Sequence, residues 1–160
     1  MEFKEAMSRV ANTVCVLSIR NSNDRIYACT ISSMVSLSVV QDNEMLLFVL
    51  KKNSRIGSQI KDSHKFSINI LSESQRAYAI EYSKPREEEF VSESKWVPFG
   101  TDFVKLRDAK LFFACRFEKC IEDYSSDIYI ARVIAQEILS NSTCLIYENR
   151  NYGSLHNDYY

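Results

Sequence analysis

The chain has 160 residues, of which 46% are apolar, and this length fits one domain, residues 1–160, with a sizeable core. Its 20 basic and 21 acidic residues are mixed along the sequence and give a formal net charge of -1. This balance argues against nucleic acid and against an anionic membrane surface as partners.

The sequence has no sign of a membrane span, a signal peptide or a metal site. No apolar run reaches membrane-spanning length, and Glu2 and Glu5 stand where a signal peptide would carry basic residues, so we expect a cytoplasmic protein. The five cysteines form no Cys-x-x-Cys pair and lie mostly in apolar runs, which predicts buried, reduced thiols. His64 and His156 are far apart in sequence, so we expect no metal.

The first third of the chain predicts one helix and then strands. Phe3, Met7 and Val10 share one side of a short helix, and the β-branched run 13–19 predicts the first strand. Turn-forming residues follow it. An extended segment begins at Arg25, with apolar residues at a spacing of two in its second half, and the apolar run 44–50 is typical of a buried strand.

The middle of the chain predicts two helices with a strand between them. Residues 54–60 place two isoleucines on one face of a helix, and 66–71 alternates apolar and polar residues as a half-buried strand does. Ser72 begins the second helix, with Gln75 in the capping-box position.

Residues 83–103 are charged and contain both prolines and the lone tryptophan. Two interpretations stay open for them: an ordered excursion over the barrel that acts as a lid, and a solvated loop. Beyond them, 111–118, 128–134 and 144–147 predict further strands. About seven strands with short turns and few helices favour a mainly β fold in which an antiparallel barrel closes or nearly closes.

Several common catalytic motifs are missing. Glycine occurs only at positions 57, 100 and 153, so neither a dinucleotide-binding glycine loop nor a P-loop can be assembled. The sequence also lacks a Gly-x-Ser-x-Gly elbow, and neither histidine has the context of a catalytic triad. These absences argue against Rossmann and P-loop nucleotide sites and against serine or cysteine hydrolase chemistry.

Hydroxyl and apolar residues alternate over 27–38. Thr30, Ser32, Ser33, Ser36 and Ser38 could offer hydrogen-bonding groups to a flavin at the mouth of a barrel. A strand with a solvated hydroxyl face is the other interpretation of the same pattern.

Seven segments resemble one family in the family's own order, among them Ser32-Ser33-x-x-Ser36-Leu37-Ser38 and Phe66-Ser-Ile-Asn-Ile-Leu71; the others are 3–10, 13–19, 46–54, 106–116 and 145–155. Over nearly its whole length the chain resembles the flavin reductase-like family of FMN-binding split barrels, which includes the small reductase components of two-component monooxygenases. The resemblance implies an antiparallel, Greek-key-like split β-barrel with a few short helices.

The resemblance also implies which residues bind the cofactor. The residues near the flavin ring and ribityl chain are Thr30, Ile31, Ser32 and Ser33, and Ser36 lies near the phosphate. The next strand adds contacts from Leu50, Lys51, Lys52, Asn53 and Ser54, and the charge for the phosphate comes from Lys51, Lys52 or Arg55. Asn69 places an amide at the edge of the ring. Lys51 and Lys52 can also be a solvated strand end, and Asn69 can serve a local backbone group.

One departure concerns the nicotinamide. The family commonly carries Gly-Asp-His before a late strand, where this chain has Tyr124-Ser-Ser-Asp127, with Ser126 nearest the histidine position. The resemblance therefore implies Ser126 and Asp127 as the nicotinamide-binding residues. A glycine usual early in the cradle is also replaced, near Tyr27-Ala28.

Three functions follow, with different tests. The first is an NAD(P)H-dependent flavin reductase that passes a hydride from NADH or NADPH to FMN, with FAD as the alternative flavin. The second is a flavin-binding electron carrier without direct NAD(P)H use, and the third is a barrel-shaped dimerisation module without flavin. The family resemblance implies a homodimer, and a partner oxygenase or redox protein is a further expectation.

Overall fold

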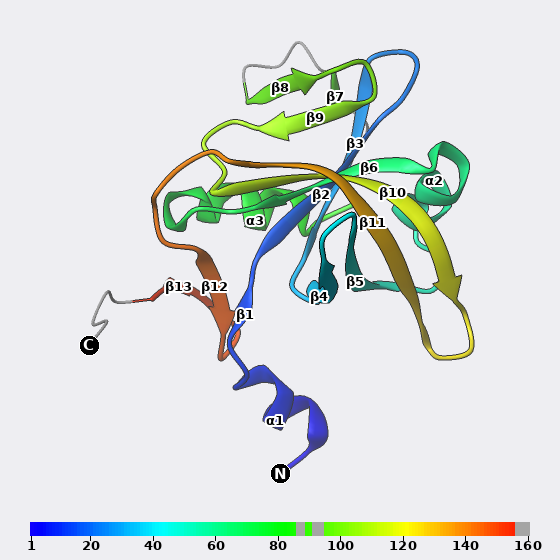
Figure 1. Ribbon diagram of the computed structural model, residues 1–160. Coiled ribbons are helices and arrows are strands. Elements are labelled where there is room, and N and C mark those ends of the chain that lie inside the picture. Colours follow the sequence, from blue (N-terminus) through cyan, green and yellow to red (C-terminus); the bar gives the residue numbers. More distant parts are fainter. Residues whose placement is uncertain (86–88, 91–94, 156–160) are drawn as a thin grey trace.

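The computed structural model describes residues 1–85, 89–90 and 95–155, and within them the fold is mainly β (Figure 1). The main sheet has the spatial order β4-β5-β11-β10-β6-β2-β3-β7, and all of its pairings are antiparallel. Its strands are β2 (Cys15–Arg20), β3 (Arg25–Ile31), β4 (Val35–Val40), β5 (Asn43–Lys51), β6 (Lys65–Ile70), β7 (Glu89–Phe90), β10 (Leu111–Ile121) and β11 (Ser126–Ile138). Sequence neighbours such as β3 and β4 lie far apart in this order.

The main sheet curls into a barrel that stays open along one side. Ser33, in the connection between β3 and β4, hydrogen-bonds to Val49 of β5 and so ties the two ends of the curled sheet together. The expected antiparallel split barrel is confirmed.

Two small sheets cover the barrel. The hairpin of β8 (Trp96–Phe99) and β9 (Phe103–Leu106) lies over the outer face of β2 and β6, and β1 (Asn12–Thr13), β12 (Leu145–Glu148) and β13 (Asn151–Ser154) form the other sheet. Trp96 is buried against Tyr82 at a ring distance of 5.7 Å. The end of the 83–103 segment is therefore packed on the barrel, while residues 86–88 and 91–94 lie outside the described residues.

The helices are short: α1 (Phe3–Ser8), α2 (Arg55–Ser63), a 3-10 turn η1 (Glu73–Gln75) and α3 (Arg76–Tyr82). Ser54 caps α2 by accepting a hydrogen bond from the Gly57 N–H at 3.2 Å, and the predicted capping box of Ser72 and Gln75 is present at η1. In the part of the chain that the structure describes, no helix has the length and apolar character needed to cross a membrane.

Apolar side chains pack on both faces of the main sheet. The barrel interior contains Leu17, Phe48, Phe66 and Tyr129, and Phe48 stacks on Tyr129 at 5.4 Å. A second core lies between the outer face and α3, β9 and β12. Because β9 covers that outer face, the prediction of a half-buried strand at 66–71 was wrong: residues 66–70 are buried on both faces.

Two apolar segments lack a cover in the described chain. The predicted helix at the N-terminus forms, but α1 extends away from the barrel and Phe3 is 80% exposed (Figure 1). The edge strand β4 exposes Val35, Leu37, Val39 and Val40. Both faces of β4 are thus open to a partner.

Candidate functional site

A cleft with a volume of about 710 Å³ opens where the barrel is split. It is lined by Ile26, Tyr27, Ala28, Cys29, Thr30, Ile31, Ser32, Ser33, Val49, Leu50, Lys51, Ser54, Arg55, Ile56, Tyr82, Ser83, Lys84, Pro85 and Ser126. Its volume lies within the roughly 300–1,000 Å³ that is usual for small-molecule and cofactor sites.

The backbone edge of β3 forms one wall of the cleft. Strand β7 pairs with β3 only at Arg25 and Ile26, so within the described part of the chain residues 28–31 have no strand partner on that side. An open strand edge offers alternating N–H donors and C=O acceptors. Such a row suits the polar edge of a planar heterocycle.

The predicted hydroxyl residues divide into three groups. Ser32 is exposed and lines the cleft. Thr30 and Ser33 also line it, but the Thr30 hydroxyl donates to the Ala79 carbonyl at 2.8 Å and the Ser33 hydroxyl is held by Val49. Ser36 lies on the exposed edge strand β4 and does not line the cleft.

The three predicted cations also separate. Lys51 and Arg55 are exposed at the cleft, and the Arg55 guanidinium lies 4.8 Å from the centre of the Tyr27 ring. The Lys52 ammonium instead donates to the carbonyls of Glu122 and Tyr124, at 2.9 and 3.3 Å, and so holds the β10–β11 turn. Of the three predicted cations, Lys51 and Arg55 therefore place positive charge at the cleft, beside the first turn of α2, and Lys84 adds a cation that was not predicted.

Asn69 lies away from the cleft. Its side chain is fully buried, donates to the Val16 carbonyl and the Ser18 hydroxyl, each at 3.2 Å, and accepts from the Leu106 N–H at 2.8 Å. These bonds join β2, β6 and β9. The side chain thus serves local groups, which was the alternative interpretation of this residue.

Ser126 and Asp127 point to opposite faces of β11, as successive strand residues do. Ser126 lines the large cleft, whereas Asp127 lines a smaller one of about 310 Å³ together with Lys52, Asn53, Ser54, Ser58, Lys61, Glu122 and Tyr129. Lys61 donates a hydrogen bond to Glu122, which raises the pKa of the Lys61 ammonium and lowers the pKa of the Glu122 carboxyl. The two implied nicotinamide residues are therefore not brought together.

All five cysteines are free thiols, as expected. Burial raises the pKa of the Cys29 thiol to about 12, and burial also raises that of Cys15 to about 12. Cys29 lines the large cleft. Thiols with such pKa values stay protonated at neutral pH and are poor nucleophiles.

Sequence reasoning missed the wall of the cleft that follows α3. Tyr82, Ser83, Lys84 and Pro85 line it from the end of that helix. The only signal was the helical spacing that puts Tyr78 and Tyr82 on one face, and that spacing indicates a core contact as readily as a ligand contact.

A mainly antiparallel split barrel with a cofactor-sized cleft, one open backbone edge and cations at one end defines a barrel with a site for a small ligand. The model of the flavin reductase-like domain matches residues 7–156, and the chain belongs to that family. This family membership confirms the expectation of a flavin reductase-like oxidoreductase.

Individual relatives agree with the family. The chain is 26% identical to the NADH-dependent flavin reductase StyB of Pseudomonas fluorescens over 133 residues, which are 83% of this chain and 75% of the relative. It is 25% identical to the NADH:riboflavin 5'-phosphate oxidoreductase of Streptomyces pristinaespiralis over 128 residues, 80% and 72% of the two chains. The structure of the styrene monooxygenase flavin reductase of Pseudomonas putida S12 is similar in fold, with a TM-score of 0.84, 21% identity and coverage of 97% and 98%.

Proposed function

We propose that the protein is an NADH-dependent flavin reductase that binds FMN in the 710 Å³ cleft. The observation that carries the proposal is the combination of the open β3 edge with Lys51 and Arg55 at the same cleft. The ring of a flavin needs an apolar slot with hydrogen-bonding groups along one edge, and its phosphate needs a cation. A bound flavin supplies the acceptor for the hydride of the nicotinamide.

The chain's own residues have separate tasks in this proposal. Residues 28–32 bind the ring edge through backbone groups, and Ile31, Leu50 and Ile56 give the slot its apolar surface. Arg55 and Lys51 bind the phosphate, helped by the positive end of α2, whose first residue is Arg55. This set fits FMN, because FMN has a single phosphate; FAD stays the alternative flavin.

The nicotinamide binds over the flavin near Ser126, the predicted nicotinamide-binding residue that lines the large cleft. A serine there donates one hydrogen bond and carries no charge at any physiological pH. Hydride transfer needs no acid or base from the protein, so a serine suffices for orientation. NADH is favoured as the donor because two of the relatives are named for it.

A specific observation also favours the second function, the electron carrier. The family's histidine position is occupied by Ser126, and the neighbouring Asp127 faces the smaller cleft. A chain that positions the nicotinamide poorly would receive electrons from a protein donor. The rate of NADH oxidation decides between these two functions.

We further propose a homodimer that uses β4 and α1. The apolar side chains of β4 are open on both faces, and Val39 is 82% exposed. Phe3 and Met7 of α1 are exposed as well. Burial of these groups against a second copy would remove exposed apolar side chains of β4 and α1 from water. Sedimentation equilibrium should give twice the chain mass, and a monomer would contradict this part of the proposal.

Steady-state turnover tests the activity. NADH and NADPH are offered separately to the protein with FMN, FAD or riboflavin, and oxidation is followed against the same flavin without protein. We expect NADH oxidation well above that background with FMN. Turnover at the background rate with every flavin, despite tight flavin binding, would favour the carrier, and absence of flavin binding would favour the dimerisation module.

The partner that receives the reduced flavin is a further part of the proposal. Reduced flavin would leave for a partner oxygenase, as the names of relatives such as the styrene monooxygenase flavin reductase suggest. The cytoplasmic location expected from the sequence also stays a prediction.

A further inference from the structure

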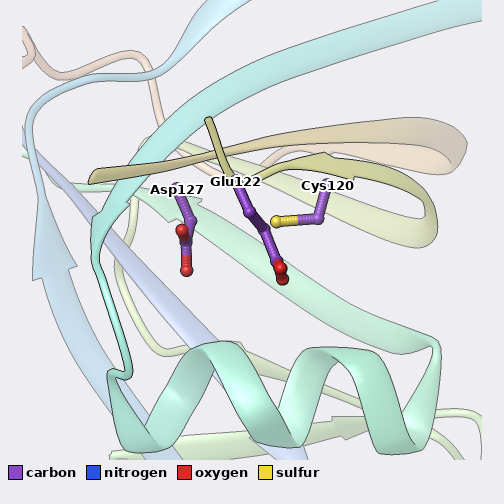
Figure 2. Close-up of side chains that lie close together, drawn as sticks. All are labelled: Cys120, Glu122 and Asp127. Atoms are coloured by element: carbon purple, nitrogen blue, oxygen red, sulfur yellow. The ribbon is translucent and has the colours of Figure 1, made fainter. Parts of the chain in front are cut away.

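A second group of polar side chains gathers at the outer end of the β10–β11 hairpin, in the smaller cleft. The Cys120 sulfur and the carboxylate oxygens of Glu122 and Asp127 all lie within 4.8 Å of one another. Figure 2 shows the three side chains projecting to the same side of the hairpin, toward the helix below them. Nothing in the proposed flavin reductase chemistry uses this group.

The strand register explains why these side chains converge. Cys120 of β10 is paired with Tyr129 of β11, so Cys120 shares a face with Tyr129 and Asp127, and Glu122 follows directly after the end of β10. The register shift between Phe117 and Lys119 inserts one extra residue into β10, so the side chains after it face the other side of the sheet from the one that strict alternation would give. Without this bulge the Cys120 side chain would point to the opposite face.

Asp127 is the member of the group whose environment is incomplete. The residue is only 4% exposed, and its buried Oδ1 atom has no hydrogen-bond partner among the described residues. A buried carboxylate oxygen without a donor destabilises the fold, because it has lost its water without gaining a hydrogen bond. The Lys61 ammonium, which also lines this cleft, donates to Glu122 instead. A cation held between Asp127, Glu122 and Cys120 would satisfy this oxygen.

We propose that Cys120, Glu122 and Asp127 form a binding site for one divalent transition metal, with zinc as the best match. A thiolate with two carboxylates suits Zn²⁺ and disfavours Mg²⁺ and Ca²⁺, which select oxygen ligands alone. Three protein ligands leave a fourth position for water. The thiol proton of Cys120 passes to the buffer on binding, and no electron is transferred.

Two features set the cost of binding. Metal–ligand bonds of about 2.0–2.3 Å require the donors to draw together by roughly 1 Å, which rotation of the exposed Glu122 and half-buried Cys120 side chains can supply. The Lys61 ammonium must also release Glu122, because it holds that carboxylate now. Its side chain is 36% exposed and can turn to solvent. Lys61 is thus a competitor of the metal, and its removal should strengthen binding.

Cobalt provides a direct probe of the thiolate ligand. The full-length protein is stripped with a chelator and titrated with Co²⁺, and the near-ultraviolet thiolate-to-cobalt absorption is followed. We expect one equivalent to bind with this band and Zn²⁺ to displace it. Absence of the band in the wild-type protein would overturn the proposal.

Matched variants locate the site. Cys120→Ser should abolish the band, whereas Cys144→Ser, a thiol outside the group, should keep it. Asp127→Asn should weaken binding at least about tenfold, and Asp123→Asn in the same turn should not. Lys61→Met should tighten binding, which no loss of folding can imitate. A band that survives Cys120→Ser, or weaker binding by Lys61→Met, would overturn the assignment.

Discussion

Ser33 and Val49 are joined by two hydrogen bonds across the split of the barrel: the Ser33 hydroxyl accepts from the Val49 N–H at 2.9 Å and donates to the Val49 carbonyl at 3.1 Å. The Ser33 side chain thus satisfies the backbone N–H and carbonyl of β5 that a neighbouring strand would otherwise satisfy at this point. The bonds fix the connection between β3 and β4 beside the candidate flavin cleft.

Replacing Ser33 by alanine should therefore loosen the split. Ser33→Ala leaves the Val49 N–H and carbonyl without this partner, and the free energy of unfolding should fall by about 1–3 kcal/mol. Urea denaturation measures this, and Ser32→Ala, an exposed neighbour in the same cleft, should change stability by less than about 0.5 kcal/mol. Equal stability of the two variants would contradict the role given to Ser33.

Arg55 should discriminate flavins that carry a phosphate from flavins that do not. In Arg55→Met, FMN affinity should fall by roughly 10- to 100-fold, because a charge-assisted contact is lost, while riboflavin affinity should stay the same. Fluorescence quenching of each flavin gives both dissociation constants. Arg116→Met removes an exposed arginine that does not line the cleft and serves as the control. Equal losses for the two flavins would show that Arg55 does not bind the phosphate.

Gly57 is needed for the close approach of α2 to the barrel. A Cβ atom at this position would lie 2.4 Å from the Tyr129 hydroxyl and 2.8 Å from the Ser54 hydroxyl. Gly57→Ala should therefore destabilise the protein by about 1–3 kcal/mol, even though alanine favours helix.

A double-mutant cycle tests the cause of that loss. In a Tyr129→Phe background the alanine should cost less, because the nearest atom is gone. Gly153→Ala, whose Cβ would meet nothing within 4 Å, should be nearly neutral. Thermal melts give all four values, and an unchanged penalty in the Tyr129→Phe background would mean that the clash lies elsewhere.

The Cys29 thiol should react slowly with alkylating agents although it lines the cleft. Its pKa of about 12, raised from 9.0 by burial, leaves roughly a thousandfold less thiolate near pH 8 than an ordinary thiol has. Because the folded pKa is raised, the rate should climb about tenfold per pH unit across the stable range. Mass spectrometry after iodoacetamide treatment locates the modified cysteines. Rapid alkylation of Cys29 at pH 8 would contradict the raised pKa.

Much of the fold could be predicted because local patterns and tertiary structure agree. The run 44–50 and the Ser72–Gln75 capping box are local signals, and both elements form. The pattern of 66–71 misled because alternation reports polarity and not exposure. Its polar residues, Ser67 and Asn69, are buried beneath β9, a strand that the sequence did not predict.

The candidate site could be predicted in outline only. The resemblance assigned residues 30–33 and 50–55 to one site, and residues of both segments line the same cleft, because both segments end strands at the split. It could not separate Lys51 from Lys52, since which lysine reaches the β10–β11 turn depends on tertiary packing. The sequence did not indicate the group at Cys120, because the group has no histidine and a single cysteine, and because a β-bulge that the sequence does not reveal aligns its members.

The most direct test of the central claim is an anaerobic titration of the FMN-loaded protein with NADH and then with NADPH, followed at the visible band of oxidised flavin. The account predicts that FMN binds and that NADH bleaches the band much faster than it bleaches free FMN. Bound flavin that stays oxidised with both donors would contradict the proposed reductase activity and would favour the electron carrier. The serine at the family's histidine position, Ser126, would then explain why the nicotinamide is not used.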